Sequence, residues 1–221
     1  MKKIDMTTYK KRNQYNWFIK YQNPCYGFNV DIDVTELVRL SKERHQSFFP
    51  YMLYAEMMAI NSIDEMRMRV VGGEPVIYEQ INPTFTVMGD DGVYLNCGFE
   101  MKKDFKSFYI ECKRIIEEAK HLGNGDELDR YPICSRSDVV FATSVPVIDY
   151  VSMSHPLPVS NQESLSITRS CFDKYHLKED GRYHVTLNIN VSHVFVDGFP
   201  LSACFNEVRR LCLDTKTFDF E

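Results

Sequence analysis

The sequence predicts a single α+β domain in which a mixed sheet forms one layer and helices pack on it as the second. Three observations support this fold class. Strand-like and helix-like segments are mixed without regular βα alternation. No internal repeat, low-complexity tract or Pro/Gly-rich linker divides the 221 residues. The 44% hydrophobic and 13% aromatic content is enough for one large core, so we expect residues 1–221 to form one domain.

Two helices are expected in the first third of the chain. One opens at residues 33–40, where Asp33 or Thr35 can cap it and apolar residues recur at helical spacing. A second is expected from Pro50 to Ala59, and it is apolar on almost every side, which is typical of a buried helix. The methionines in and after it are interpreted as core residues rather than a ligand surface.

Strand patterns begin after Gly72-Gly73. Residues 75–78 and 84–88 have β-type composition, and a Gly-Asp-Asp-Gly turn leads into 93–97, which predicts a hairpin. A helix is expected at 104–120, because its apolar residues form one helical stripe. Strands are expected at 138–144, 165–168 and 183–193 from their composition and alternation. A helix-starting proline predicts a last helix from Pro200 to Cys212.

Composition and charge argue against several functions. The net charge of −5 and the short, interrupted basic clusters do not suit a nucleic-acid surface. No apolar run is long enough to span a membrane, and the N-terminus lacks the apolar core of a signal peptide. The seven cysteines contain no CxxC pair or metal-ligand spacing. We therefore expect a cytoplasmic protein with free thiols and no metal.

His193 is the clearest candidate for chemistry. It ends the longest predicted strand, and Asp197-Gly198 follow in a short loop. A rigid strand behind a histidine and an exposed turn in front of it suit a general base, because an imidazole ordinarily titrates near neutral pH. Asp197 can orient this loop through a charge-assisted contact. Taken alone, however, the HxxxDG spacing favours an ordinary strand end before an Asp-Gly turn.

The segment 192–199, followed by Phe205-Asn206-Glu207, resembles the signature of the chloramphenicol acetyltransferases. This resemblance covers nearly the whole chain and favours catalysis at His193. It implies the fold of the CoA-dependent acyltransferases and a homotrimer with an active site in each cleft between neighbouring subunits. Further segments match the family in order along the chain, at 24–28, 49–54, 64–69, 82–87 and 144–152.

The resemblance implies an O-acetyltransferase that uses acetyl-CoA as co-substrate and holds no permanent cofactor. His193 would take the proton from an acceptor hydroxyl, which then attacks the thioester directly. Ser152 would donate to the oxyanion, and losing one such donor typically costs about 3 kcal/mol of barrier. Asp197 would form a structural ion pair, with Lys11 at the family's arginine position and Arg12 next to it as candidate partners.

The resemblance also implies an acceptor pocket for a small molecule such as chloramphenicol. Aromatic residues and a lone cysteine at apolar positions are equally typical of a core. Cys25 is an alternative nucleophile by analogy with Cys/His enzymes, although nothing near it in sequence lowers its thiol pKa. Val147 replaces the family's tryptophan, and the segment 168–175 is longer than its counterpart. By position, the substrate-binding candidates are Phe18, Cys25, Phe28, Tyr94, Asn96 and Thr168.

Three functions fit these observations. The first is a chloramphenicol O-acetyltransferase. The second is a related trimeric acyltransferase with a different hydroxyl or thiol acceptor. The dihydrolipoamide acyltransferases share the HxxxDG turn, but we do not expect their upstream lipoyl modules in this chain. The third is a non-catalytic trimeric binding protein, since a fold does not fix a function.

Overall fold

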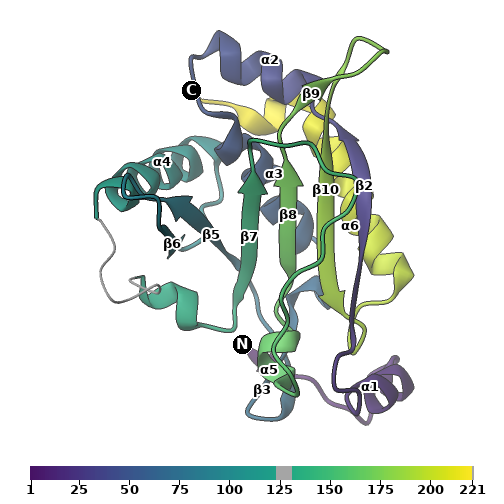
Figure 1. Ribbon diagram of the computed structural model, residues 1–221. Coiled ribbons are helices and arrows are strands. Elements are labelled where there is room, and N and C mark those ends of the chain that lie inside the picture. The colour runs from purple at the N-terminus through teal and green to yellow at the C-terminus, as the bar shows by residue number, and fades with distance from the viewer. Residues whose placement is uncertain (123–130, 221) are drawn as a thin grey trace.

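A seven-stranded mixed sheet forms one layer of the computed structural model, which describes residues 1–122 and 131–220 (Figure 1). Strand β7 is parallel to both β5 and β8, and the other neighbours are antiparallel. The predicted α+β class with a mixed sheet is confirmed. Across the sheet the order is β2 (Cys25–Asp33), β10 (Tyr183–Ser192), β8 (Arg169–Asp173), β7 (Val139–Val145), β5 (Asn82–Met88) and β6 (Tyr94–Gly98), with the short β9 (His176–Leu177) beside β10.

Helices cover one face of this sheet (Figure 1). The covering helices are α2 (Thr35–Glu43), α3 (Phe48–Asn61), α4 (Phe105–His121) and α6 (Gly198–Leu213). A three-stranded sheet lies at one end of the molecule and contains β1 (Lys2–Lys3), β4 (Glu74–Ile77) and β3 (Met68–Val71). The remaining short elements are α1 (Arg12–Phe18), α5 (Gln162–Leu165) and the 3₁₀ turns η1 (Asp64–Arg67), η2 (Pro132–Ser135) and η3 (Thr215–Phe218).

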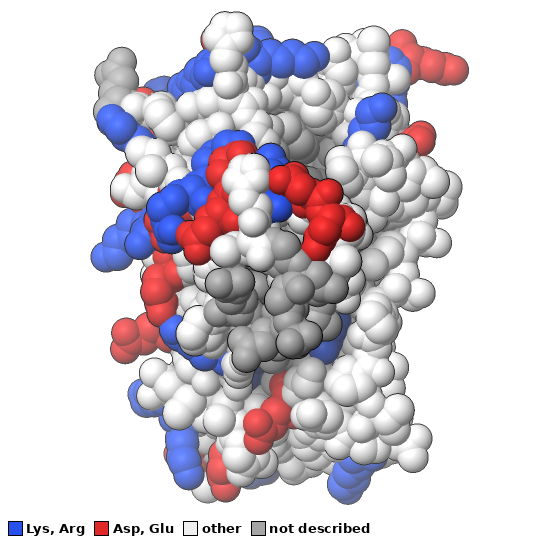
Figure 2. Space-filling model, turned by 60° about the vertical axis from the view of Figure 1, so that its left-hand side comes forward, with Lys and Arg blue, Asp and Glu red and all other residues white. Residues whose placement is uncertain are grey.

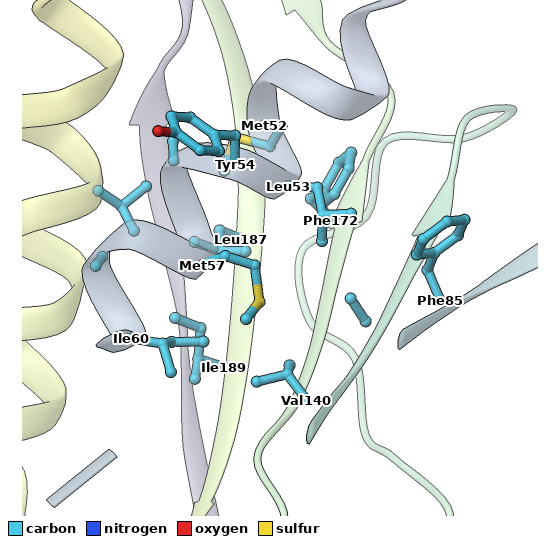
Figure 3. Close-up of a cluster of buried hydrophobic side chains, with 14 of the residues drawn as sticks. Met52, Leu53, Tyr54, Met57, Ile60, Phe85, Val140, Phe172, Leu187 and Ile189 are labelled. Atoms are coloured by element: carbon cyan, nitrogen blue, oxygen red, sulfur yellow. The ribbon is translucent and has the colours of Figure 1, made fainter. Parts of the chain in front are cut away.

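Helix α3 is the centre of the core, as its apolar sequence predicts. Met52, Leu53 and Met57 have no exposed surface, and Leu53 and Met57 project towards the sheet (Figure 3). The methionines that follow, Met66 and Met68, are buried as well, so their interpretation as core residues is confirmed. The sheet side chains that Figure 3 labels around α3 are Phe85, Val140, Phe172, Leu187 and Ile189.

The predicted strand at 165–168 is wrong. Residues 162–165 form α5 instead, and the strand begins at Arg169. The Asn161 side chain explains this difference, because its Oδ1 accepts a hydrogen bond from the Ser164 N–H at 3.1 Å and so caps a helical turn. Helices α3 and α6 each begin two residues before the proline that was expected to start them.

The other face of the sheet is polar. On β10 the side chains alternate, so that Val185, Leu187 and Ile189 join the helical core, whereas Asn188 and its alternating neighbours point the other way. Residues 146–161 cross this polar face (Figure 1). Their Met153 N–H donates to Asn29 Oδ1 at 3.1 Å. Only one face of the sheet is therefore packed against helices.

The surface mixes charges of both signs. Figure 2 shows lysine and arginine side chains interspersed with aspartate and glutamate on the side that it presents. Along α4, Arg114 pairs with Glu111 and Glu118, which is an ordinary solvated helix face. In the described part of the chain, no helix is long and apolar enough to cross a membrane. The same residues contain no cluster of three or more potential metal ligands.

Candidate active site

Contacts from α1, from β2 and from Pro24 just before β2 hold His193 in place directly after β10. Its N–H donates to the Pro24 carbonyl at 2.9 Å, next to the start of β2. From α1, the Gln14 side chain donates to the His193 carbonyl at 2.8 Å. The imidazole stacks on the Phe18 ring with centroids 4.0 Å apart and an interplanar angle of 10°. The Tyr26 ring lies 4.7 Å away on β2, so the ring orientation of His193 is restricted by packing.

The two ring nitrogens of His193 lie in different environments. Nδ1 is buried and has no hydrogen-bond partner among residues 1–122 and 131–220. The residue as a whole is half-buried, so Nε2 is the nitrogen that a substrate can reach. An imidazole that is clamped between rings, with one accessible nitrogen, is suited to accept a proton from a bound hydroxyl.

Asp197 fixes the loop that follows His193. One carboxylate oxygen accepts the Phe199 N–H at 2.9 Å and so caps α6, and the other lies 2.9 Å from Lys11 Nζ. Lys11 is thus the basic partner, and it also lies 2.7 Å from Glu65. Burial raises the pKa of Asp197, but the bonds from Lys11 and from the Phe199 amide outweigh burial and hold that pKa below its usual value. The Asp197 carboxylate bonds these groups rather than the His193 ring.

Glu65 is a residue of this site that the sequence did not indicate. It lies in η1, and only the fold brings it beside Lys11. Arg12, the alternative partner of Asp197, is exposed at the start of α1. No ion pair of Arg12 is present in the described chain.

Ser152 does not meet His193 within one chain. Ser152 is exposed in the segment that crosses the polar face, next to Met153, which bonds Asn29. Asn29 pairs with Asn188, and that position precedes His193 by five residues, or about 16 Å along an extended strand. In the ranges described, no hydrogen bond joins Ser152 to His193.

Thr168, one of the substrate-binding candidates, is buried. It precedes β8 and is only 2% exposed. Its carbonyl accepts the Phe141 N–H at 3.0 Å. A role of Thr168 in binding substrate stays a prediction.

The acceptor candidates fall into two groups at opposite edges of the sheet. Phe18 stacks on His193, and Phe28 on the edge strand β2 lies 5.8 Å from the Tyr26 ring. Tyr94 and Asn96 lie on β6, the other edge strand. Five strand spacings separate β2 from β6, which corresponds to about 24 Å.

Cys25 lies at the first position of β2, on the polar face. Its thiol donates to the Leu165 carbonyl at 3.3 Å. Burial raises the pKa of the Cys25 thiol to about 11, although Arg169 lowers it slightly. The thiol is therefore protonated at neutral pH, which argues against Cys25 as a nucleophile.

Two cavities lie near the end of β7, one under the crossing segment and the other beside the start of α3. The cavity beside Tyr94 and Asn96 has a volume of about 430 Å³, within the range of small-molecule sites. A neighbouring cavity of about 390 Å³ is lined by aromatic side chains together with Lys174. Ser144 contributes to both cavities, so they adjoin at the end of β7.

Comparisons with known proteins agree on one family. The family model described as "Chloramphenicol acetyltransferase" matches residues 1–209. Chloramphenicol acetyltransferase 3 of Escherichia coli is 24% identical over 225 residues, covering 95% of this chain and 96% of the relative. A chloramphenicol acetyltransferase of Clostridium perfringens is 26% identical over 212 residues, covering 95% and 97%.

Solved structures show the same fold. A structure described as chloramphenicol acetyltransferase aligns with a TM-score of 0.87 at 23% identity, covering 96% of this chain and all of the other. A probable dihydrolipoamide acetyltransferase from Listeria monocytogenes aligns with a TM-score of 0.65 at 14% identity, covering 100% and 97%.

Proposed function

The chain belongs to the chloramphenicol acetyltransferase family of enzymes, and on this premise we propose that it transfers an acetyl group from acetyl-CoA to a hydroxyl of chloramphenicol. The observation that carries the proposal is the environment of His193. Its ring is clamped by Phe18 and Tyr26, and only Nε2 is open to a substrate. The loop after it is fixed by Asp197 and Lys11.

The reaction needs only a base and an oxyanion donor from the protein. Nε2 of His193 takes the proton of the acceptor hydroxyl, and the oxygen attacks the thioester carbonyl of acetyl-CoA. The Ser152 hydroxyl donates to the oxyanion of the tetrahedral intermediate. The intermediate then collapses, the C–S bond breaks, and the departing sulfur of CoA receives the proton from the imidazolium. The products are the acetyl ester and free CoA.

We further propose that the site is completed by a second copy of the chain, in a homotrimer. The support is the separation of Tyr94 and Asn96 from His193 across the sheet. Large aromatic side chains are exposed at both edges, including Trp17 and Phe28 near β2 and Tyr94 on β6. Exposed apolar groups of this kind often mark protein interfaces. Light scattering checks the mass, and a monomer that is fully active would contradict this arrangement.

The two adjoining cavities suggest where the substrates bind. The cavity with Tyr94 and Asn96 would take the acceptor, and the aromatic cavity with Lys174 at its lining would take the pantetheine arm of acetyl-CoA. None of the seven cysteines forms a disulfide and six of them are buried, which supports a reducing cytoplasmic location.

The test is an assay that detects free CoA thiol. Purified protein, acetyl-CoA and chloramphenicol should release CoA, and His193→Ala should lower the rate at least about a hundredfold. His121→Ala is the matched control, since His121 is an exposed histidine on α4, away from His193. An unchanged rate in His193→Ala would sink the mechanism.

A different acceptor is the second candidate function. The observation that favours it is the presence of His155 and Arg169 in the lining of the acceptor cavity, beside Phe141. Turnover of another alcohol, with none of chloramphenicol, would select this alternative. Failure of acetyl-CoA to bind in calorimetry would instead indicate a non-catalytic binding protein.

A further inference from the structure

Arg169 is a buried cation without an acidic partner. It is the first residue of β8, its side chain lies on the polar face, and it is only 7% exposed. Arginines buried to this extent are normally paired with a carboxylate. Throughout residues 1–122 and 131–220, no carboxylate forms an ion pair with the Arg169 guanidinium. Its positive charge is therefore uncompensated by the described protein.

The hydrogen bonds of Arg169 leave one edge of the guanidinium open. A guanidinium has five N–H donors. Nη1 donates to the carbonyls of Ser164 and Ile167, both at 3.0 Å, and Nη2 donates to Ser164 Oγ at 3.1 Å. Among the residues described, Nε–H and the second N–H of Nη2 have no acceptor. These two donors lie on the same edge of the group and form the fork that binds two carboxylate oxygens.

The surroundings of this open edge suit a small organic anion. The guanidinium carbon lies 5.4 Å from the centre of the Phe141 ring, and both residues line the cavity of about 430 Å³. The lining contains no aspartate or glutamate in the described chain. His155 also lines it and is hydrogen-bonded through Nε2 to Asn188 Oδ1 at 2.9 Å. Burial, together with the charge of Arg169, lowers the pKa of His155, so this imidazole adds no second cation near neutral pH.

We propose that Arg169 binds a carboxylate of the acceptor in this cavity, so that the preferred acceptors are hydroxyl-bearing carboxylic acids. The inference rests on the proposed function for the transfer itself, but not for the binding of the anion. A planar carboxylate takes both free donors of the fork, and its charge compensates the buried guanidinium. Phe141 and Tyr94 supply apolar surface for the rest of the acceptor.

Binding is tested by calorimetry with benzoate, which has the carboxylate and a ring but no hydroxyl to acetylate. Wild-type protein should bind it, and Arg169→Met should weaken the affinity at least about tenfold, because the charge-paired bonds are lost. Arg169→Lys keeps a charge without the fork and should also weaken binding. Arg169→Lys replaces Arg169→Met in this test if the methionine variant fails to fold. Arg209→Met, which removes an exposed arginine on α6, is the control for net charge and should bind as wild type does.

Equal benzoate affinity in wild type and both folded Arg169 variants would overturn the proposal. Loss of affinity in both Arg169 variants, with none in Arg209→Met, supports it.

Kinetics test the link to acceptor choice. The paired acceptors are 4-(hydroxymethyl)benzoate and its methyl ester, which differ only in the charged group. Wild type should favour the acid in kcat/KM by about tenfold, and the preference should disappear in Arg169→Met. An equal rate for acid and ester in wild type would refute the specificity. Chloramphenicol turnover without benzoate binding sinks this inference alone, whereas Arg169-dependent benzoate binding without turnover of any acceptor sinks only the proposed function.

Discussion

Replacing Asp197 by alanine tests whether this residue acts through its two structural bonds rather than directly in the reaction. The carboxylate caps α6 through the Phe199 N–H and pairs with Lys11. Loss of an N-cap costs about 1 kcal/mol of folding free energy. The ion pair is partly exposed, and Lys11 keeps Glu65, so its loss adds only about 0.5 kcal/mol. We expect Asp197→Ala to lower the free energy of unfolding by about 1.5 kcal/mol, which corresponds to about 3–6 °C in Tm for a chain of this size.

The matched variant is Asp197→Asn. Asparagine is as good a cap as aspartate, so this variant should lose only the ion pair, about 0.5 kcal/mol. Activity should follow the same order, because the loop of His193 is freed more by alanine. A displacement of a catalytic group by about 1 Å can cost about a hundredfold in rate. Urea unfolding and steady-state kinetics on both variants provide the measurement.

The pH dependence supplies a second check on Asp197. Its folded-state pKa lies below the unfolded value of about 4, so the stabilisation is complete above that pH and is lost as the pH falls through the folded pKa. The stability difference between wild type and Asp197→Ala should therefore shrink in acid. Equal stabilities of the alanine and asparagine variants at pH 7 would refute the assignment of the cap.

Three further changes test the site and the core. Ser152→Ala should lower kcat about a hundredfold with little change in KM, and an unaltered kcat would exclude Ser152 as the oxyanion donor. Phe18→Ala removes the ring stacked on His193 and should lower kcat/KM about tenfold, and full activity would show that the ring is held without it. Glu56 is fully buried in α3. Burial raises the pKa of its carboxyl to about 7, even though Ser170 acts to lower that pKa. The free energy of unfolding of the wild type should therefore fall as the pH rises from 5 to 8, whereas that of Glu56→Gln should not. Parallel curves of stability against pH for the two proteins would contradict the raised pKa of Glu56.

The sequence predicts best those elements whose pattern depends on one buried face. Strand β10 alternates over its full length, and α3 is apolar on nearly every side, so both were predicted close to their observed bounds. Strand β2 was missed because it is an edge strand with partly exposed side chains on both faces. At 165–168 the local cap from Asn161 prevails over a β-type composition.

The candidate site was predicted where motif and strand coincide, and not where distant segments meet. His193 and Asp197 are candidates because the spacing of one loop coincides with the family resemblance, and Lys11 is a candidate from its place in that resemblance. Glu65 carries no local signal, because its approach to Lys11 depends on how η1 packs beside α1. The separation of Asn96 from His193 is set by the strand order and is invisible in the linear sequence.

The contact from Gln14 to the His193 carbonyl joins residues 179 positions apart. This hydrogen bond thus joins α1, near the start of the chain, to the loop that bears the His193 imidazole. During synthesis the loop with His193 leaves the ribosome after most of the chain, whereas Gln14 is among the first residues made. Pairings that span so much of the chain form slowly, because loop closure must precede any gain from contact. The molecule should accordingly acquire its helices before its activity, and refolding followed by far-ultraviolet circular dichroism should run ahead of the return of turnover.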